Sequence, residues 1–178
     1  MHIFLQGPKN TGKSTVIRKT LDILTEHSPI TLGGFFTWSS GGSEPDIFMR
    51  PAERDRGKEV YRIAGYSAES GGLDCDIDVF ENIGTRLLTE CAGAQLLIMD
   101  ELGKLESGAP VFRRAVLNAL SGDIPILGVL RLGDVPWLAE IRDDSRVTLI
   151  DVNKKNRDSL PREIAGTPAF ALWVSGIN

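Results

Sequence analysis

The sequence has few of the residues that build zinc sites. Only two cysteines and two histidines occur among 178 residues, and they are widely separated: Cys75, Cys91, His2 and His27. This number and spacing exclude the paired ligands of a structural zinc site. We interpret the cysteines as reduced thiols of a reducing cytosol, and a disulfide between them is the alternative.

Long apolar runs and an excess of positive charge are also missing. No stretch approaches the roughly 18 apolar residues of a membrane-spanning helix. No charged segment followed by a long apolar region precedes the first expected strand, so we expect no signal peptide. The formal net charge is −4, which gives no electrostatic footprint for nucleic acid. We therefore expect a cytoplasmic protein without a membrane partner and without nucleic acid as its main partner.

The remaining composition is that of an ordinary globular protein. Hydrophobic residues make up 42% of the chain and charged residues 25%. A chain of this length can bury its own core, and no internal repeat, low-complexity block or long linker divides it. We predict a single domain over residues 1–178.

A glycine-bounded loop near the N-terminus is the most informative motif. Its residues fit the pattern G-x-x-x-x-G-K-[ST] and are Gly7, Pro8, Lys9, Asn10, Thr11, Gly12, Lys13, Ser14 and Thr15. A short apolar run precedes the loop, and an amphipathic segment over about 13–26 follows it. This strand, loop and helix context is the one that a phosphate-binding loop requires.

Elementary chemistry explains the spacing in this loop. Gly7 and Gly12 let the backbone curl so that successive N–H groups point at one anion. The following helix adds the partial positive charge of its N-terminus. Lys13 would reach the β- and γ-phosphates, and the Ser14 hydroxyl would ligate Mg²⁺. The loop therefore predicts that the chain binds a nucleoside polyphosphate.

Expected strands and helices alternate along the rest of the chain. Strands are expected at 30–38, 95–100, 124–130 and 147–152, and helices at 76–89, 109–120, 135–142 and 156–165. Short connections between them predict a mostly parallel sheet with helices on both faces. Ligands of such sheets bind at the carboxyl ends of the strands, which brings Leu5, Met99 and Leu130 around one cleft.

The segment from 46 to 74 departs from this alternation. Short strands joined by a polar turn are expected over 46–66, followed by a glycine-rich loop over 67–74. Five basic residues are interleaved there with acidic ones: Arg50, Arg54, Arg56, Lys58 and Arg62. We interpret this stretch as a solvated hairpin of mixed charge, and the alternative is a basic lid over a phosphate.

Two neighbouring acids follow the apolar run at 95–99. Asp100 is expected to end its strand and to hold Mg²⁺ beside Ser14. Glu101 would orient an attacking water or take its proton. The alternative for Glu101 is a structural role, as a cap of the next turn that pairs with Lys104.

Arg131 follows another expected strand at the edge of the same cleft. It could supply a positive charge to a phosphoryl transition state from within the chain. The interpretation that we prefer from sequence alone is a surface arginine that pairs with Asp134.

Together these segments resemble a known family. The phosphate loop, Gly33-Gly34-Phe35, the box from Asp100 to Glu106 and the segment 152–157 resemble the THEP-type (cancer-related) small nucleoside-triphosphatases. That family shows a D-E-[IL]-G-K-[ML]-E box and a late T-x-x-N-R box, and the resemblance spans about residues 2–160. Two departures stand out: Asn10 replaces a common glycine, which asparagine's tolerance of a left-handed backbone allows, and the first Thr of the late box is missing.

The resemblance implies an α/β fold of the three-layer, RecA-like P-loop NTPase type, with a mostly parallel sheet and a small antiparallel hairpin insertion. It implies Mg²⁺-dependent hydrolysis of nucleoside triphosphates to diphosphates with broad base tolerance. Lys13, Ser14, Asp100 and Glu101 would form the core site. Asn156 and Arg157 match the late box and would lie near the nucleotide, or they would merely begin a helix.

Other functions share these motifs. A small-molecule or nucleotide kinase would use the same loop but needs an acceptor pocket. A slow nucleotide-dependent switch, activated by an unknown protein, would need little turnover. Residues 153–156 lack the final acid of the guanine-specific Asn-Lys-x-Asp motif, so guanine specificity is not supported. The apolar tail at 169–174 is expected to dock on the domain, and a partner surface is the alternative.

Overall fold

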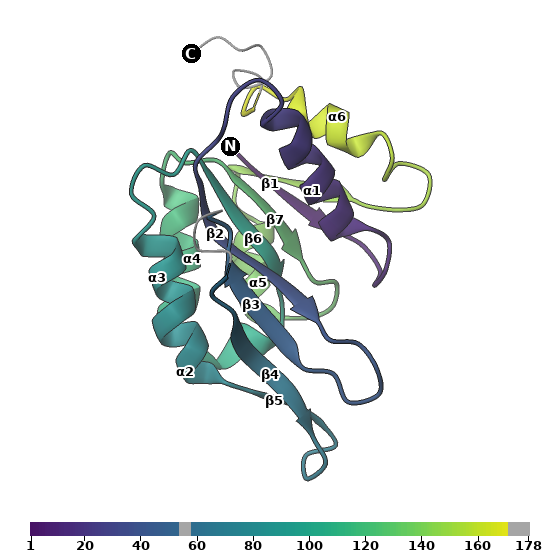
Figure 1. The fold of residues 1–178 in the computed structure, drawn as a ribbon, viewed down its shortest axis with the longest axis vertical. Coiled ribbons are helices and arrows are strands. Elements are labelled where there is room, and N and C mark those ends of the chain that lie inside the picture. Colours follow the sequence, from purple (N-terminus) through teal and green to yellow (C-terminus); the bar gives the residue numbers. More distant parts are fainter. Residues whose placement is uncertain (54–57, 171–178) are drawn as a thin grey trace.

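An eight-stranded sheet forms the centre of the described part of the molecule (Figure 1). The structure is a computed structural model that describes residues 1–53 and 58–170. The strand order is β5-β4-β3-β2-β6-β7-β1-β8. The strands are β1 (His2–Gln6), β2 (Leu32–Ser39), β3 (Ile47–Pro51), β4 (Tyr61–Ser67), β5 (Gly72–Cys75), β6 (Leu96–Leu102), β7 (Ile126–Leu130) and β8 (Val147–Asp151).

Helical segments connect most of these strands. They are α1 (Lys13–Leu24), α2 (Ile77–Val79), the π-helical turn η1 (Phe80–Gly84), α3 (Thr85–Thr89), the 3₁₀ turn η2 (Leu105–Gly108), α4 (Pro110–Ser121), α5 (Pro136–Arg142) and α6 (Leu160–Ala165). Asp76 caps α2 by accepting a hydrogen bond from the backbone N–H of Val79 at 3.2 Å. No helix in the described ranges combines the length and apolar character needed to cross a membrane.

The sheet is parallel in one part and antiparallel in the other. Strands β2, β6, β7, β1 and β8 pair in parallel. Strands β3, β4 and β5 continue the sheet beyond β2 as antiparallel neighbours. The expected α/β fold, with a mostly parallel sheet and a small antiparallel part, is therefore confirmed.

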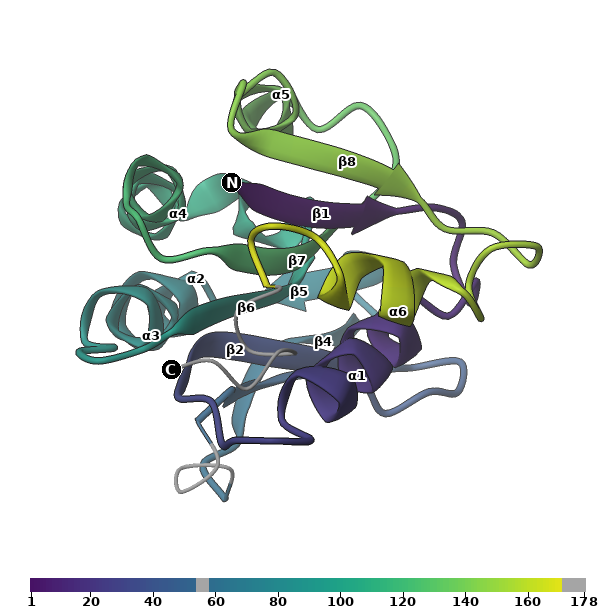
Figure 2. The same cartoon turned by 90° about the horizontal axis from the view of Figure 1, so that it is seen from above.

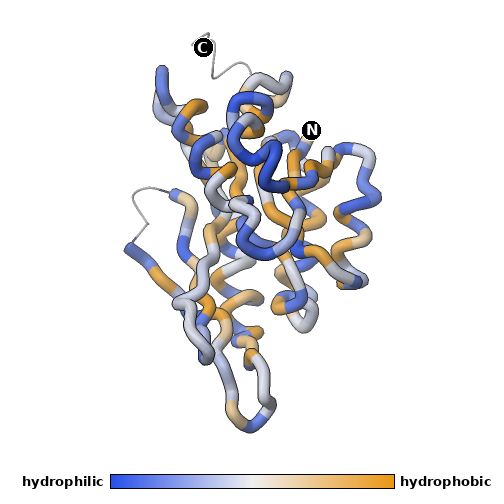
Figure 3. The backbone as a smooth tube through the Cα atoms, turned by 90° about the vertical axis from the view of Figure 1, so that its right-hand side faces the viewer, coloured by the Kyte–Doolittle hydropathy of each residue, from blue (hydrophilic) through white to orange (hydrophobic). Residues whose placement is uncertain are grey.

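Helices cover both faces of the parallel part. In Figure 2, α1 and α6 lie on one face, and α3, α4 and α5 lie on the other. Alternate residues of the central strands point to opposite faces, since Ile98 packs with the α1 and α6 side and Met99 with the α3–α5 side. Figure 3 shows apolar colouring along the central strands and alternating colours around the helices. Burial on both faces explains why these strands are continuous apolar runs.

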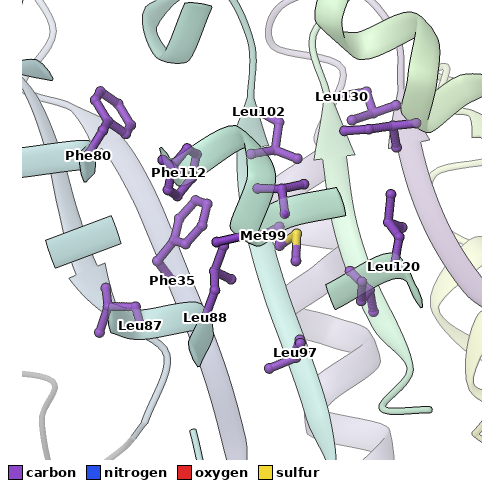
Figure 4. Close-up of a cluster of buried hydrophobic side chains, with 14 of the residues drawn as sticks. Phe35, Phe80, Leu87, Leu88, Leu97, Met99, Leu102, Phe112, Leu120 and Leu130 are labelled. Atoms are coloured by element: carbon purple, nitrogen blue, oxygen red, sulfur yellow. The ribbon is translucent and has the colours of Figure 1, made fainter. Parts of the chain in front are cut away.

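Aromatic side chains fill the core on the α3–α5 side. The ring of Phe112 from α4 lies 5.8 Å from the ring of Phe35 and 5.4 Å from that of Phe80, measured between centroids (Figure 4). On β7, a Cβ added to Gly128 would lie 2.5 Å from the Phe4 ring. The glycine therefore gives the aromatic side chain its space.

The structure corrects several element boundaries. Residues 72–75 form strand β5 at the edge of the sheet, although a loop was predicted, because a short, mostly exposed edge strand lacks an apolar alternation. Helix α6 begins at Leu160 and not at Asn156. On α4, Val111 is 54% exposed although it is apolar. Phe170 is fully buried against the α1 and α6 side, and residues 171–174 of the tail lie outside the described residues.

Gly34 permits the close pairing of β2 with β6, which gives a stability prediction. Gly34 has φ +84°, and an added Cβ would collide with the Ile98 carbonyl oxygen. Gly41 has nearly the same φ, +80°, with nothing near an added Cβ. We expect Gly41→Ala to lower the free energy of unfolding by roughly 1–2 kcal/mol, because only backbone strain is added. Gly34→Ala should lower it by at least about 3 kcal/mol, since a clash inside the sheet is added to that strain.

Urea denaturation of both variants measures this difference. Equal losses in the two variants would show that the contact with Ile98 has no cost.

Candidate functional site

The loop between β1 and α1 has the backbone that its glycines predict. Gly7 has φ +149° and Gly12 has φ +101°, and both values lie in the region that favours glycine. Asn10 is the one non-glycine residue with positive φ among the described residues, at +64°, which confirms its left-handed conformation. A Cβ on Gly7 would lie 2.5 Å from the Val152 carbonyl oxygen, so the segment after β8 fits closely against the loop.

The Lys13 side chain folds back over this loop. Its ammonium nitrogen donates to the carbonyl oxygens of Gly7 at 2.9 Å and Pro8 at 3.0 Å. Lys13 is only 8% exposed. An ammonium has three N–H donors, so these two bonds leave one for a phosphate oxygen. These bonds hold the ammonium group of Lys13 against the loop and out of solvent.

Ser14 and Asp100 meet across the boundary between α1 and β6. The Ser14 hydroxyl donates to Oδ1 of Asp100 at 3.2 Å, although the two residues are 86 positions apart. Burial raises the pKa of Asp100 to about 7; the carboxylate of Glu101 adds to this rise, while the Ser14 hydrogen bond and the Lys13 ammonium oppose it. A buried carboxylate beside a hydroxyl is a pair of oxygen donors that suits Mg²⁺.

Glu101 lies inside β6 and not beyond its end. The strand continues to Leu102, so the prediction that Asp100 ends the strand was wrong. The backbone N–H of Glu101 donates to the Thr37 hydroxyl of β2 at 3.0 Å. Phe36 and Asp100 are partners in the pairing of β2 with β6, which brings Thr37 beside Glu101. Sequence reasoning missed Thr37, since only the strand register identifies it.

Glu101 and Arg131 are neighbours at the edge of the parallel strands. Nη1 of Arg131 lies 3.9 Å from Oε1 of Glu101, with the arginine side chain 57% exposed and the glutamate side chain 33% exposed. Neither the Glu101–Lys104 pair nor the Arg131–Asp134 pair of the sequence analysis occurs among the described residues. An exposed pair of this kind adds at most about 1 kcal/mol to stability. Its interest is therefore that it brings an acid and a cation together where β6 and β7 end.

The turn after β8 brings Arg157 to the phosphate loop. Its Cδ lies 3.6 Å from where a Cβ on Gly12 would be. The amide of Asn156 holds the turn itself, because Oδ1 accepts from the backbone of Asn153 and Nδ2 donates to the carbonyl of Asp151. The interpretation of these two residues as the start of a helix was wrong, because α6 begins at Leu160.

The basic segment is only partly described. Arg54 and Arg56 lie outside the described residues. Arg50 is placed over the Phe36 ring at 4.7 Å, and Arg62 pairs with Asp46 at 2.7 Å. These local contacts favour the hairpin interpretation over a lid for the arginines that the structure describes.

Glu106 is a buried acid to which the sequence analysis gave no role. It is 2% exposed, and its Oε2 accepts a hydrogen bond from the backbone N–H of Gly103 at 2.8 Å. Burial raises the pKa of Glu106 to about 7, and the charge of Glu101 adds to the rise. The signal available in the sequence was its place in the acidic box, where its burial could not be recognised.

The raised pKa of Glu106 gives a pH prediction. The carboxyl has an ordinary pKa of 4.5, so between pH 4.5 and about 7 the folded protein binds more protons than the unfolded chain. The free energy of unfolding should therefore fall as pH rises through this window, by roughly 3 kcal/mol from this group. The side chain of the Glu106→Gln variant cannot ionise. The free energy of unfolding of this variant should therefore fall less than that of wild type between pH 5 and pH 8, by roughly the same 3 kcal/mol.

Urea denaturation of both proteins across this pH range makes the comparison. Parallel stability profiles for the two proteins would contradict the assignment to Glu106.

Known proteins resemble the chain over most of its length. A family model described as NTPase matches residues 2–165. The protein named nucleoside-triphosphatase THEP1 of Methanosarcina barkeri is 30% identical over 172 residues, covering 93% of this chain and 95% of its own. The solution structure of a human cancer-related nucleoside triphosphatase is 26% identical, with a TM-score of 0.72 over 92% of this chain and 95% of that one. The crystal structure of THEP1 from Aquifex aeolicus, 21% identical, shares the fold with a TM-score of 0.73 over 92% of this chain and 96% of that one.

Proposed function

The chain belongs to the NTPase family and is a nucleoside-triphosphatase, and from this premise we propose a reaction and a mechanism. The reaction is the release of the γ-phosphate of nucleoside triphosphates, with Mg²⁺ and broad base tolerance. The nucleophile is a water molecule activated by Glu101. The observation that carries the proposal is the Ser14–Asp100 hydrogen bond. It joins the phosphate loop to the acids of β6, which are the two halves that phosphoryl transfer needs.

The loop is suited to hold the polyphosphate. Backbone N–H groups of the loop would point at the anion, except at Pro8, which has none, and the N-terminus of α1 would add its partial positive charge. Lys13 directs its remaining N–H donor at one phosphate oxygen and places its positive charge beside the β- and γ-phosphates. Arg157 lies against Gly12, near enough to the loop to add a second positive charge, whereas both ends of the Asn156 amide hold the turn that carries it.

Ser14 and Asp100 fit a Mg²⁺ ion. The Ser14 hydroxyl and the Asp100 carboxylate are hard oxygen donors, and their hydrogen bond keeps them within one coordination site. Within residues 1–53 and 58–170 no group of three or more His, Cys, Asp or Glu side chains could hold an ion. This is compatible with Mg²⁺, which keeps several waters and binds substrate phosphates. When bound, the ion neutralises charge that develops on the phosphate oxygens.

Glu101 and Arg131 then act on the attacking water and on the transition state. The Glu101 carboxylate accepts a proton from the attacking water, and its backbone is held by Thr37. Arg131 directs a positive charge at the same place and stabilises the negative charge of the transition state. Water as the acceptor requires no second substrate pocket, which distinguishes this reaction from the kinase alternative.

A phosphate-release assay over ATP, GTP, CTP, UTP and their deoxy forms tests the proposal. We expect release from several bases in the presence of Mg²⁺ with no acceptor added, and little release with chelator. Turnover that depends on an added acceptor would favour a kinase. Tight binding of triphosphate with negligible turnover would favour the switch.

A further inference from the structure

Two buried side chains hold the backbone of Gly103, one at its N–H and one at its carbonyl. Glu106 accepts a hydrogen bond from its N–H at 2.8 Å, and the indole Nε1–H of Trp137 donates to its carbonyl oxygen at 2.9 Å. Glu106 comes from η2 and Trp137 from α5, so two separate elements hold the two peptide groups on either side of the Gly103 Cα. Gly103 follows Glu101 by two residues, and the position of its peptide therefore limits where Glu101 can lie.

The same short segment supports Arg131. The backbone N–H of Arg131 donates to the Leu102 carbonyl at 2.9 Å. A Cβ on Gly103 would lie 3.1 Å from Cδ of Arg131 and 3.3 Å from its Cβ. The aliphatic part of the arginine therefore packs directly on the glycine backbone. A shift of the backbone at Gly103 would move both members of the Glu101–Arg131 pair.

Burial alone does not favour an acid at position 106. Removing a carboxylate from water is costly, and an apolar side chain of similar volume is often at least as stabilising. Burial raises the pKa of Glu106, and the charge of Arg131 only partly opposes this. What an apolar side chain could not supply is the acceptor for the Gly103 N–H.

We propose that Glu106 and Trp137 are positioning residues of the hydrolytic site, which hold the backbone on both sides of Gly103 so that Glu101 and Arg131 keep the spacing that water activation requires. This inference rests on the proposed function. Neither residue touches the reacting atoms. Both act through the backbone of Gly103, which supports Glu101 and Arg131. A displacement of about 1 Å in such a group can cost roughly 100-fold in rate.

Three variants test the clamp, which we define as the two hydrogen bonds of Gly103: its N–H donates to Glu106, and its carbonyl accepts from Trp137. Glu106→Leu removes the acceptor and Trp137→Phe removes the donor, while both keep most of the buried volume. Each is expected to lower kcat for phosphate release by about 10- to 100-fold with KM unchanged. Glu106→Gln keeps an acceptor oxygen and is expected to restore kcat to within about threefold of wild type.

Glu81→Leu is the matched control. Glu81 also accepts hydrogen bonds from backbone N–H groups, those of Val111 and Phe112, but at the start of α4. This variant should lose stability in urea and keep kcat. Calorimetry with a non-hydrolysable ATP analogue and Mg²⁺ should give one affinity for all the variants, which separates positioning from substrate binding.

The outcomes distinguish the two proposals. A wild-type protein that releases no phosphate would overturn the proposed function and this inference with it. Phosphate release by wild type together with unchanged kcat in Glu106→Leu and Trp137→Phe would overturn the positioning role alone. An equal fall of kcat in Glu81→Leu, or no recovery in Glu106→Gln, would also overturn it.

Discussion

Replacing Glu101 by glutamine is expected to lower kcat for triphosphate hydrolysis by about 10²- to 10⁴-fold while the affinity for nucleotide stays unchanged. The amide has nearly the shape of the carboxylate but cannot accept the proton of the attacking water. The backbone of Glu101 is held by Thr37, so the substituted side chain should stay in the same place. Phosphate release measures kcat, and calorimetry with a non-hydrolysable analogue measures affinity.

Glu90→Gln is the matched control for this result. Glu90 also lies beside an arginine, Arg86, with Nε and Oε2 3.4 Å apart, but at the end of α3. The chemical change and the loss of one ion pair are the same, so kcat should not respond. Near-native turnover of Glu101→Gln would show that Glu101 is not the base.

Replacing Lys13 by alanine is expected to weaken binding of the triphosphate itself, by roughly 10- to 100-fold. A hydrogen bond to a charged group contributes about 1.5–3 kcal/mol, and in the proposed function Lys13 supplies such a donor to the phosphates. The effect should be larger for triphosphate than for diphosphate, because the γ-phosphate loses its partner. Calorimetric titration with both nucleotides in the presence of Mg²⁺ measures the two affinities.

Lys19→Ala serves as the control for this variant. Lys19 is an exposed residue of the same helix, so the net charge changes equally while the loop keeps its ammonium. A Lys13→Ala protein that binds triphosphate as tightly as wild type would contradict the assignment of Lys13.

The phosphate loop was predictable because its information is local. Glycines at two fixed positions permit backbone angles that other residues avoid, and Lys13 and Ser14 follow from the same short pattern. The central strands were predictable for a similar reason, since burial on both faces leaves continuous apolar runs. The side of α1 that is buried also follows from the spacing of its apolar residues.

The partners of Glu101 were not predictable from local pattern. Sequence reasoning offered Lys104 for Glu101 and Asp134 for Arg131, because neighbours in the chain are the only pairs that a sequence displays. The structure instead pairs Glu101 with Arg131 and supports it with Thr37, 64 residues away. Such contacts depend on the register between β2, β6 and β7. Trp137 and Glu106 escaped notice because a buried hydrogen bond to a backbone peptide has no sequence signature.

The position of β1 determines when the site can exist during synthesis. Of the described strands, β1 is made before the others, yet it lies between β7 and β8, and the carbonyl of Val152 lies directly behind Gly7. The N-terminal loop therefore has no complete packing surface until β8 and Val152 have been translated. Contacts that join distant parts of a chain also form slowly, because a large loop must be closed before they are gained. Nascent chains that stop before β8 should consequently fail to retain nucleotide even though they carry the whole phosphate-binding motif.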